Sequence, residues 1–340
     1  TEVNTSKQIK FIESLVIGHV VLKKIGNFDD KKVRKYIDDS IQKVKLNKYS
    51  NFYAVGGSFR ALAKLHMHIK SEDLKIIQDY KVDSAKFLHE IRTKIFVNKN
   101  TVDENFLSQL FKSRKKSIPY SFHVLEMLVQ KMSIKKICFT NTGVREGVLY
   151  DLIKDKGVDP FLSQIRKIAR GTIKKRNAEK LFSWILPFND ILKMDQNLLL
   201  SACWLTNIAS SLHPEHRRIF ALEKILYHQF FHLDRQNRIM LALILYFRYS
   251  NNLKENFALS YSEKISKKNL IKVKILGQLL RMAHHITGRL NYNNLDQCKL
   301  TINSINKVNF KAKKTYLLFG QSFERGMKNI SDAFESLKSN

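Results

Sequence analysis

Apolar and polar positions follow two different periods along residues 1–155. Short apolar runs predict three buried strands, at residues 10–17, 52–55 and 137–140. Amphipathic stretches predict helices at residues 30–46 and 59–68, and the pattern between 70 and 130 is helical throughout. In that stretch Asp83 and Ser117 stand at cap positions, and Pro119 falls in a first turn. Strands that alternate with helices predict an α/β layer domain.

From residue 159 onward the chain is almost purely helical. Segments with a 3.6-residue period lie at 160–170, 174–185, 195–212, 216–231, 234–249, 260–268 and 271–288. Pro187, Pro214 and the polar stretch 250–255 interrupt them. Residues 297–309 alternate weakly and predict a small hairpin before a last helix at 313–337. The pattern therefore predicts two domains, 1–155 and 156–340.

Three strands are few for the sheet of an α/β domain. An incomplete sheet leaves an open hydrogen-bonding edge, which natural proteins usually cover. We therefore expect further strands upstream of residue 1, and the first residue is Thr1 rather than Met.

Two glycine loops each follow a predicted strand and precede a predicted helix. Gly56, Gly57 and Ser58 form the first, and the second runs from Asn141 to Gly143, with Arg145 in the helix behind it. Glycine lets backbone N–H groups turn outward, and a helix N-terminus carries partial positive charge, so an anion can bind there. Such junctions also occur for packing reasons alone.

Charge supports an anionic ligand without locating its site. Sixty Lys and Arg against 30 Asp and Glu give a formal net charge of +30. This favours a polyanionic partner, although a chain so rich in Lys, Ile and Asn is also what an AT-rich genome would encode. Three cysteines without a CxxC spacing fit a reduced, cytoplasmic protein, and no apolar run reaches the ~18 residues of a membrane span.

Five blocks resemble, in order and spacing, the exopolyphosphatase / guanosine pentaphosphate phosphohydrolase (Ppx/GppA) family. They are residues 54–65, 119–128, 142–153, 178–188 and 201–218. The resemblance implies an α+β two-domain fold, with part of an actin-like, ribonuclease H-like α/β domain before an all-α, HD-like helical domain. Residues 1–155 would be the family's second α/β domain, incomplete at its N-terminus, and residues 156–340 the helical domain.

The resemblance also implies an activity. Members of the family use Mg²⁺ and a catalytic glutamate to hydrolyse the terminal phosphoanhydride of inorganic polyphosphate or guanosine pentaphosphate. That glutamate and the first α/β domain would lie upstream of Thr1, so we expect no catalytic residue in this chain and no turnover by it alone. Two other functions stay open: a non-catalytic polyphosphate- or nucleotide-binding regulator, and a basic helical nucleic-acid-binding protein. Spread basic residues and the lack of a nucleic-acid-binding motif disfavour the last.

By the same resemblance, Gly56, Gly57 and Ser58 would bind phosphate, followed by Gly143 and Arg145. The residues of a polyphosphate channel would be Arg60, His213, His216, Arg217 and Arg248. A solvated surface turn is an equally good explanation of the histidines and arginines at 213–218. An HD metal site needs an adjacent His-Asp pair, but Thr206 and Asn207 stand where it would be sought, so we expect no metal ligands. The open sheet edge, and pairing in the family, favour a homodimer.

Overall fold

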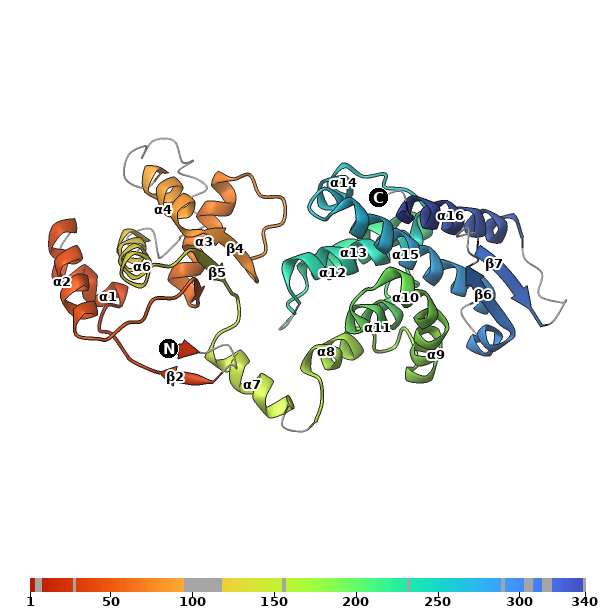
Figure 1. Cartoon of the computed structure of the whole chain (residues 1–340), viewed down its shortest axis with the longest axis horizontal. Coiled ribbons are helices and arrows are strands. Elements are labelled where there is room, and N and C mark those ends of the chain that lie inside the picture. The colour runs from red at the N-terminus through yellow and green to blue at the C-terminus, as the bar shows by residue number, and fades with distance from the viewer. Residues whose placement is uncertain are drawn as a thin grey trace. The chain divides into compact units, whose positions relative to one another are not determined.

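The computed structural model describes residues 1–3, 8–26, 29–94, 118–154, 157–230, 233–288, 291–302, 308–313 and 320–338 (Figure 1). The chain divides into two compact units, Thr1–Arg145 and Glu146–Asn340. This division falls within helix α7 (Val144–Lys154). The domain boundary expected at residue 155 remains a prediction.

The first unit contains a three-stranded sheet of order β3-β5-β4, made of β3 (Asn51–Ala54), β5 (Lys136–Phe139) and β4 (Tyr80–Asp83). Strands β3 and β5 are parallel, whereas β4 runs antiparallel to β5. A separate antiparallel pair joins β1 (Glu2–Val3) to β2 (Ile9–Phe11). No described strand pairs with the outer edge of β3, where the Tyr53 side chain is 68% exposed.

The helices of the first unit pack in two apolar clusters. Helices α3 (Gly57–Ile69), α4 (Ser84–Arg92) and α6 (Ile118–Met132) form one cluster with the sheet, whereas α1 (His19–Gly26) and α2 (Asp30–Gln42) form the other with α6. Leu62 of α3, Phe87 of α4 and Phe122 of α6 are fully buried in one cluster with Phe139 of β5. The apolar faces of α3, α4 and α6 thus form the core that holds the sheet.

Two expectations for this unit were wrong. The strand expected at 10–17 is only Ile9–Phe11, and the stretch expected to be helical from 70 to 130 contains strand β4. Strand β4 has only four residues, so its alternating pattern is too short to be distinguished from the helical pattern around it. Pairing with β5 determines the conformation of these residues. Asp83 does cap α4, since its carboxylate accepts a hydrogen bond of 3.0 Å from the Lys86 amide. Ser117 lies outside the described residues.

The second unit is helical, as expected. Its helices are α8 (Pro160–Ile168), α9 (Lys175–Ile185), α10 (Asn189–Leu192), α11 (Gln196–Leu205), α12 (Pro214–Tyr227), α13 (Arg235–Tyr249), α14 (Asn256–Ser262), α15 (Lys267–Thr287) and α16 (Gln321–Lys338), with short 3₁₀ helices η4 (Leu186–Phe188) and η5 (Tyr292–Gln297). The expected hairpin is present as β6 (Cys298–Ile302) paired antiparallel with β7 (Val308–Ala312), beside α16 (Figure 1). The helix expected at 260–268 was misplaced, because Ser266 caps α15 and ends that segment.

Arg238 of α13 is buried against the C-terminal end of α12. Its side chain is 1% exposed, and its Nη1 donates to the carbonyl oxygens of Ile225, Leu226 and His228, where α12 ends. These carbonyls have no partner within the helix, so the guanidinium satisfies acceptors that burial would otherwise leave unpaired. Burial lowers the pKa of Arg238 to about 10.

Charged side chains tie three helices of the first unit together. Glu126 of α6 is 2% exposed, and its carboxylate accepts hydrogen bonds from Arg34 of α2, at 2.7 Å, and from Arg92 of α4. A buried carboxylate requires such partners, because desolvation of an unpaired charge is costly. Helices far apart in sequence are therefore joined through one residue.

We predict that Glu126→Gln lowers the free energy of unfolding by about 2 kcal/mol. This loss is smaller than for a fully buried ion pair, because both arginines reach solvent, which screens the interaction. Urea denaturation measures the change. Glu179→Gln is the control, since Glu179 forms only an exposed pair with Lys175 at 3.7 Å. Equal effects of the two substitutions would show that the Glu126 network does not stabilise the fold.

Acid should destabilise the first unit through His66. Its Nδ1 lies 2.7 Å from the Tyr80 hydroxyl and its Nε2 lies 2.8 Å from Glu90. Burial lowers the pKa of His66 below 6.5, although Glu90 opposes the shift. The unfolded state therefore binds the proton more readily, so this contribution to stability is complete above pH 6.5 and is lost as pH falls towards the folded-state pKa. The test measures the free energy of unfolding from pH 7.5 down to about 5. This free energy should fall less steeply with pH in His66→Gln than in the unchanged protein. The same pH dependence in both proteins would contradict the prediction.

Candidate phosphate-binding site

Parallel pairing of β3 with β5 brings the two glycine loops together. The register pairs Ala54 with Phe139, so both strands end at the same edge of the sheet. One loop, residues 55–56, leads from β3 into the start of α3, and the other, residues 140–143, leads from β5 into α7. The Thr140 amide donates to the Ala54 carbonyl at 3.3 Å and joins the starts of the two loops. Crevices at the carboxyl ends of parallel strands are where open α/β sheets bind ligands.

Helix α3 begins in a conformation that leaves its first amides available. Gly56 has φ 117° and ψ 161°, and its carbonyl accepts the Arg60 amide at 3.0 Å. No side chain caps the helix, and among the described residues no acceptor bonds the amides of Gly57 and Ser58. Two N–H donors and the positive end of the helix dipole therefore face outward, as anion binding requires.

A cavity of about 230 Å³ opens onto these amides. Residues 56–59 line it together with Gly18 and His19 at the start of α1, and with Tyr120 and Ser121 at the start of α6. The Gly18 carbonyl accepts the Leu22 amide at 3.0 Å, so α1 also begins at this cavity. The sequence did not single out His19, because residues 10–17 were expected to be a strand ending at Gly18. None of the described residues that line the cavity is Asp or Glu.

Gly143, in the neighbouring loop, and Arg145, in the first turn of α7, do not line this cavity. Gly143 is partly exposed and Arg145 is exposed, at the start of α7, where Glu146 occupies the first turn. Arg60 lies on α3 without lining the cavity, and its Nε is buried with no acceptor in the part of the chain that the structure describes. The structure thus brings the predicted phosphate residues to one sheet edge, and their contacts with phosphate remain predictions.

The residues expected to line a polyphosphate channel in the helical unit have unlike environments. His213 and His216 are exposed at the start of α12, and the Arg217 Nε donates to the Leu212 carbonyl at 2.8 Å. Arg248 is only 4% exposed, and its Nε donates to the Thr206 hydroxyl at 3.2 Å. A ligand at the exposed turn could therefore meet the two imidazoles, whereas Arg248 is part of the core.

Metal ligands are not gathered in the part of the chain that the structure describes. There, no group of three or more His, Cys, Asp or Glu could hold a metal ion. Of the two residues where an HD pair was sought, Thr206 accepts from Arg248, and Asn207 donates to the Tyr292 hydroxyl at 3.1 Å. A guanidinium beside weak ligands opposes a divalent cation, so these residues do not fit one.

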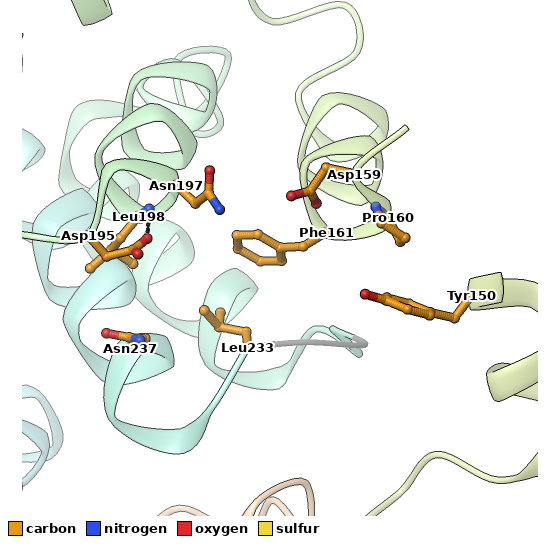
Figure 2. Close-up of a pocket in the computed structure, with 9 residues that line it drawn as sticks. All are labelled: Tyr150, Asp159, Pro160, Phe161, Asp195, Asn197, Leu198, Leu233 and Asn237. Carbon is orange, nitrogen blue, oxygen red and sulfur yellow. Dashed lines mark hydrogen bonds between the residues drawn. The ribbon is translucent and has the colours of Figure 1, made fainter. Parts of the chain in front are cut away.

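A second cavity, of about 250 Å³, lies within the helical unit (Figure 2). Asp159 and Asp195 line it, and each caps a helix by accepting an amide at 2.9 Å, from Leu162 and Leu198 respectively. Figure 2 shows Phe161 between these capped helices. Because the capping carboxylates already compensate the helix dipoles, this cavity is a poor site for phosphate. No described helix is long and apolar enough to cross a membrane.

Two protein-family models match the chain. Residues 1–156 match the Ppx/GppA phosphatase family. Residues 192–319 match the model described as exopolyphosphatase, C-terminal. Together the two matches support the Ppx/GppA family. They agree with the resemblance seen in the sequence and with a mixed α/β region that precedes a helical one. No curated protein matches the chain.

We predict that Gly56→Ala weakens binding of inorganic tripolyphosphate about tenfold, equivalent to ~1.4 kcal/mol. A Cβ at this position meets no atom within 4 Å, so the effect arises from φ 117°, which side chains rarely adopt. Isothermal titration calorimetry measures the dissociation constant. Gly147→Ala is the matched control, because Gly147 lies in helix α7 and its Cβ also has open space. If both variants bind like the unchanged chain, the start of α3 does not contact the phosphate.

Proposed function

We propose that this chain is the phosphate-binding and helical portion of a Ppx/GppA phosphohydrolase that removes terminal phosphate from inorganic polyphosphate or guanosine pentaphosphate. The terminal phosphate would bind at the carboxyl edge of β3 and β5. Gly57 and Ser58 would donate their amides, and Gly143 and Arg145 would contact it from the second loop. The family matches and the outward amides at the start of α3 support this assignment.

The observation that carries the proposal furthest is the lining of the 230 Å³ cavity. Its lining includes backbone amides, two serines, a tyrosine and a histidine, but no Asp or Glu among its described residues. Phosphoryl transfer to water needs a group that positions and deprotonates the attacking water. The site is thus suited to hold phosphate, and we propose that hydrolysis requires a base that this cavity does not supply.

Members of the family depend on a divalent metal, and Mg²⁺ is the ion expected here. The described residues do not form a cluster that would hold it, so no step of the reaction is assigned to a metal bound by this chain. Basic residues exceed acidic ones twofold, which favours long polyanions without distinguishing polyphosphate from guanosine pentaphosphate.

The test combines binding with turnover. We expect the chain to bind long-chain polyphosphate or guanosine pentaphosphate, with affinity that falls as salt rises, and to release no phosphate from either in the presence of Mg²⁺. Calorimetry gives the affinity, and a phosphate-release assay gives the turnover. Arg145→Gln should weaken binding about three- to tenfold, while Lys175→Gln, an exposed lysine of the helical unit, should leave it unchanged.

Three outcomes would change the assignment. Phosphate release by the chain alone would place a base within it and overturn the proposed division of roles. Binding of double-stranded DNA or RNA in place of both phosphate compounds would favour a nucleic-acid-binding protein. Failure to bind any of these ligands would remove the phosphate site altogether.

A further inference from the structure

Gln78 contacts the second glycine loop from outside the sequence motifs. Its Oε1 accepts the Thr140 hydroxyl at 2.9 Å and the Asn141 amide at 3.0 Å. Both donors follow β5 directly, more than sixty residues from Gln78 in sequence. The side-chain carbonyl oxygen of Gln78 thus accepts two hydrogen bonds, one for each lone pair, from the loop that leads to Gly143 and Arg145.

Strand register explains how Gln78 reaches this loop. Strand β4 pairs Tyr80 with Phe139 and Lys81 with Cys138, so continuing the antiparallel ladder would place residue 78 opposite residue 141. The ladder does not continue, because Asp79 has φ 60° and the Tyr80 amide turns back to the Ile77 carbonyl at 3.0 Å. The side-chain carbonyl of Gln78 takes the place of the missing backbone acceptor for Asn141.

Thr140 extends the same network into the loop. Its hydroxyl proton is given to Gln78, so its oxygen is the acceptor for Thr142. The Thr142 amide donates to this oxygen at 3.0 Å, and the Thr142 hydroxyl lies 2.6 Å away. Residues 140–142 are therefore held in a tight turn immediately before Gly143, with Gln78 as the outer support.

We propose that Gln78 is a positioning residue of the phosphate site. It fixes the loop after β5, and thereby the places of Gly143 and Arg145, without touching the ligand itself. The effect of Gln78 on ligand binding rests on the proposed function. Its effect on the conformation of the loop does not, because that effect comes from the hydrogen bonds to Thr140 and Asn141. Preorganised loops bind more tightly because less ordering is required when the ligand arrives.

The experiment compares Gln78→Ala, Thr140→Val and Thr140→Ser in the full chain, with inorganic tripolyphosphate as the probe. We expect Gln78→Ala and Thr140→Val each to raise the dissociation constant about tenfold, and the double variant to lose little more, because both remove one network. Thr140→Ser keeps the hydroxyl and should bind like the unchanged chain. Gln130→Ala is the matched control, since Gln130 is an exposed glutamine of α6.

A second measurement keeps the two proposals distinguishable. Hydrogen exchange of the 140–146 segment should accelerate in Gln78→Ala, while the midpoint of thermal unfolding shifts by no more than in Gln130→Ala. If tripolyphosphate binds the unchanged chain and Gln78→Ala equally well, the inference about Gln78 fails. If tripolyphosphate binds neither the unchanged chain nor Gln78→Ala, the proposed function fails. If hydrogen exchange of residues 140–146 is also the same in both proteins, the role of Gln78 in holding the loop fails as well.

Discussion

The parallel pairing of β3 with β5 is the constraint on which the candidate site depends. Two loops separated by more than eighty residues meet only because their strands run in the same direction and end at the same register. Were either strand reversed, one loop would lie at the opposite edge of the sheet. The apolar residues Ala54, Ile137 and Phe139, all fully buried, fix this pairing through the core beneath it. Packing energy therefore sets the geometry of the site.

The sequence predicted what is local in this arrangement. Both glycine loops, the strands before them and the helices after them are visible in the order of apolar, glycine and polar residues. A start of α3 at Gly57 follows from local chemistry, since only glycine readily adopts the conformation of Gly56. Most helices of the second unit were found for the same reason, because each buries one face at a period of 3.6 residues.

What the sequence missed depends on contacts between distant residues. Strand β4 has four residues, and without β5 beside it nothing distinguishes them from the helical pattern on either side. His19 and Gln78 reach the site only through the fold, one from the start of α1 and the other across a broken ladder. The burial of Arg248 was equally hidden, because a basic residue near the end of an amphipathic helix usually extends to solvent.

Under the proposed function, the candidate site and the overall charge would contribute to anion binding in different ways. The cavity at the start of α3 contains no Lys or Arg among its described lining residues, so its contacts would come from amides, hydroxyl groups and an imidazole. The backbone amides discriminate by geometry, because the fold fixes their directions. A net charge of +30, spread over both parts of the chain, instead raises the local concentration of any polyanion and weakens with salt. If the proposed function holds, attraction of a polyanion to this chain would be nonspecific, and selection of a terminal phosphate would rest with the few residues that shape the two loops.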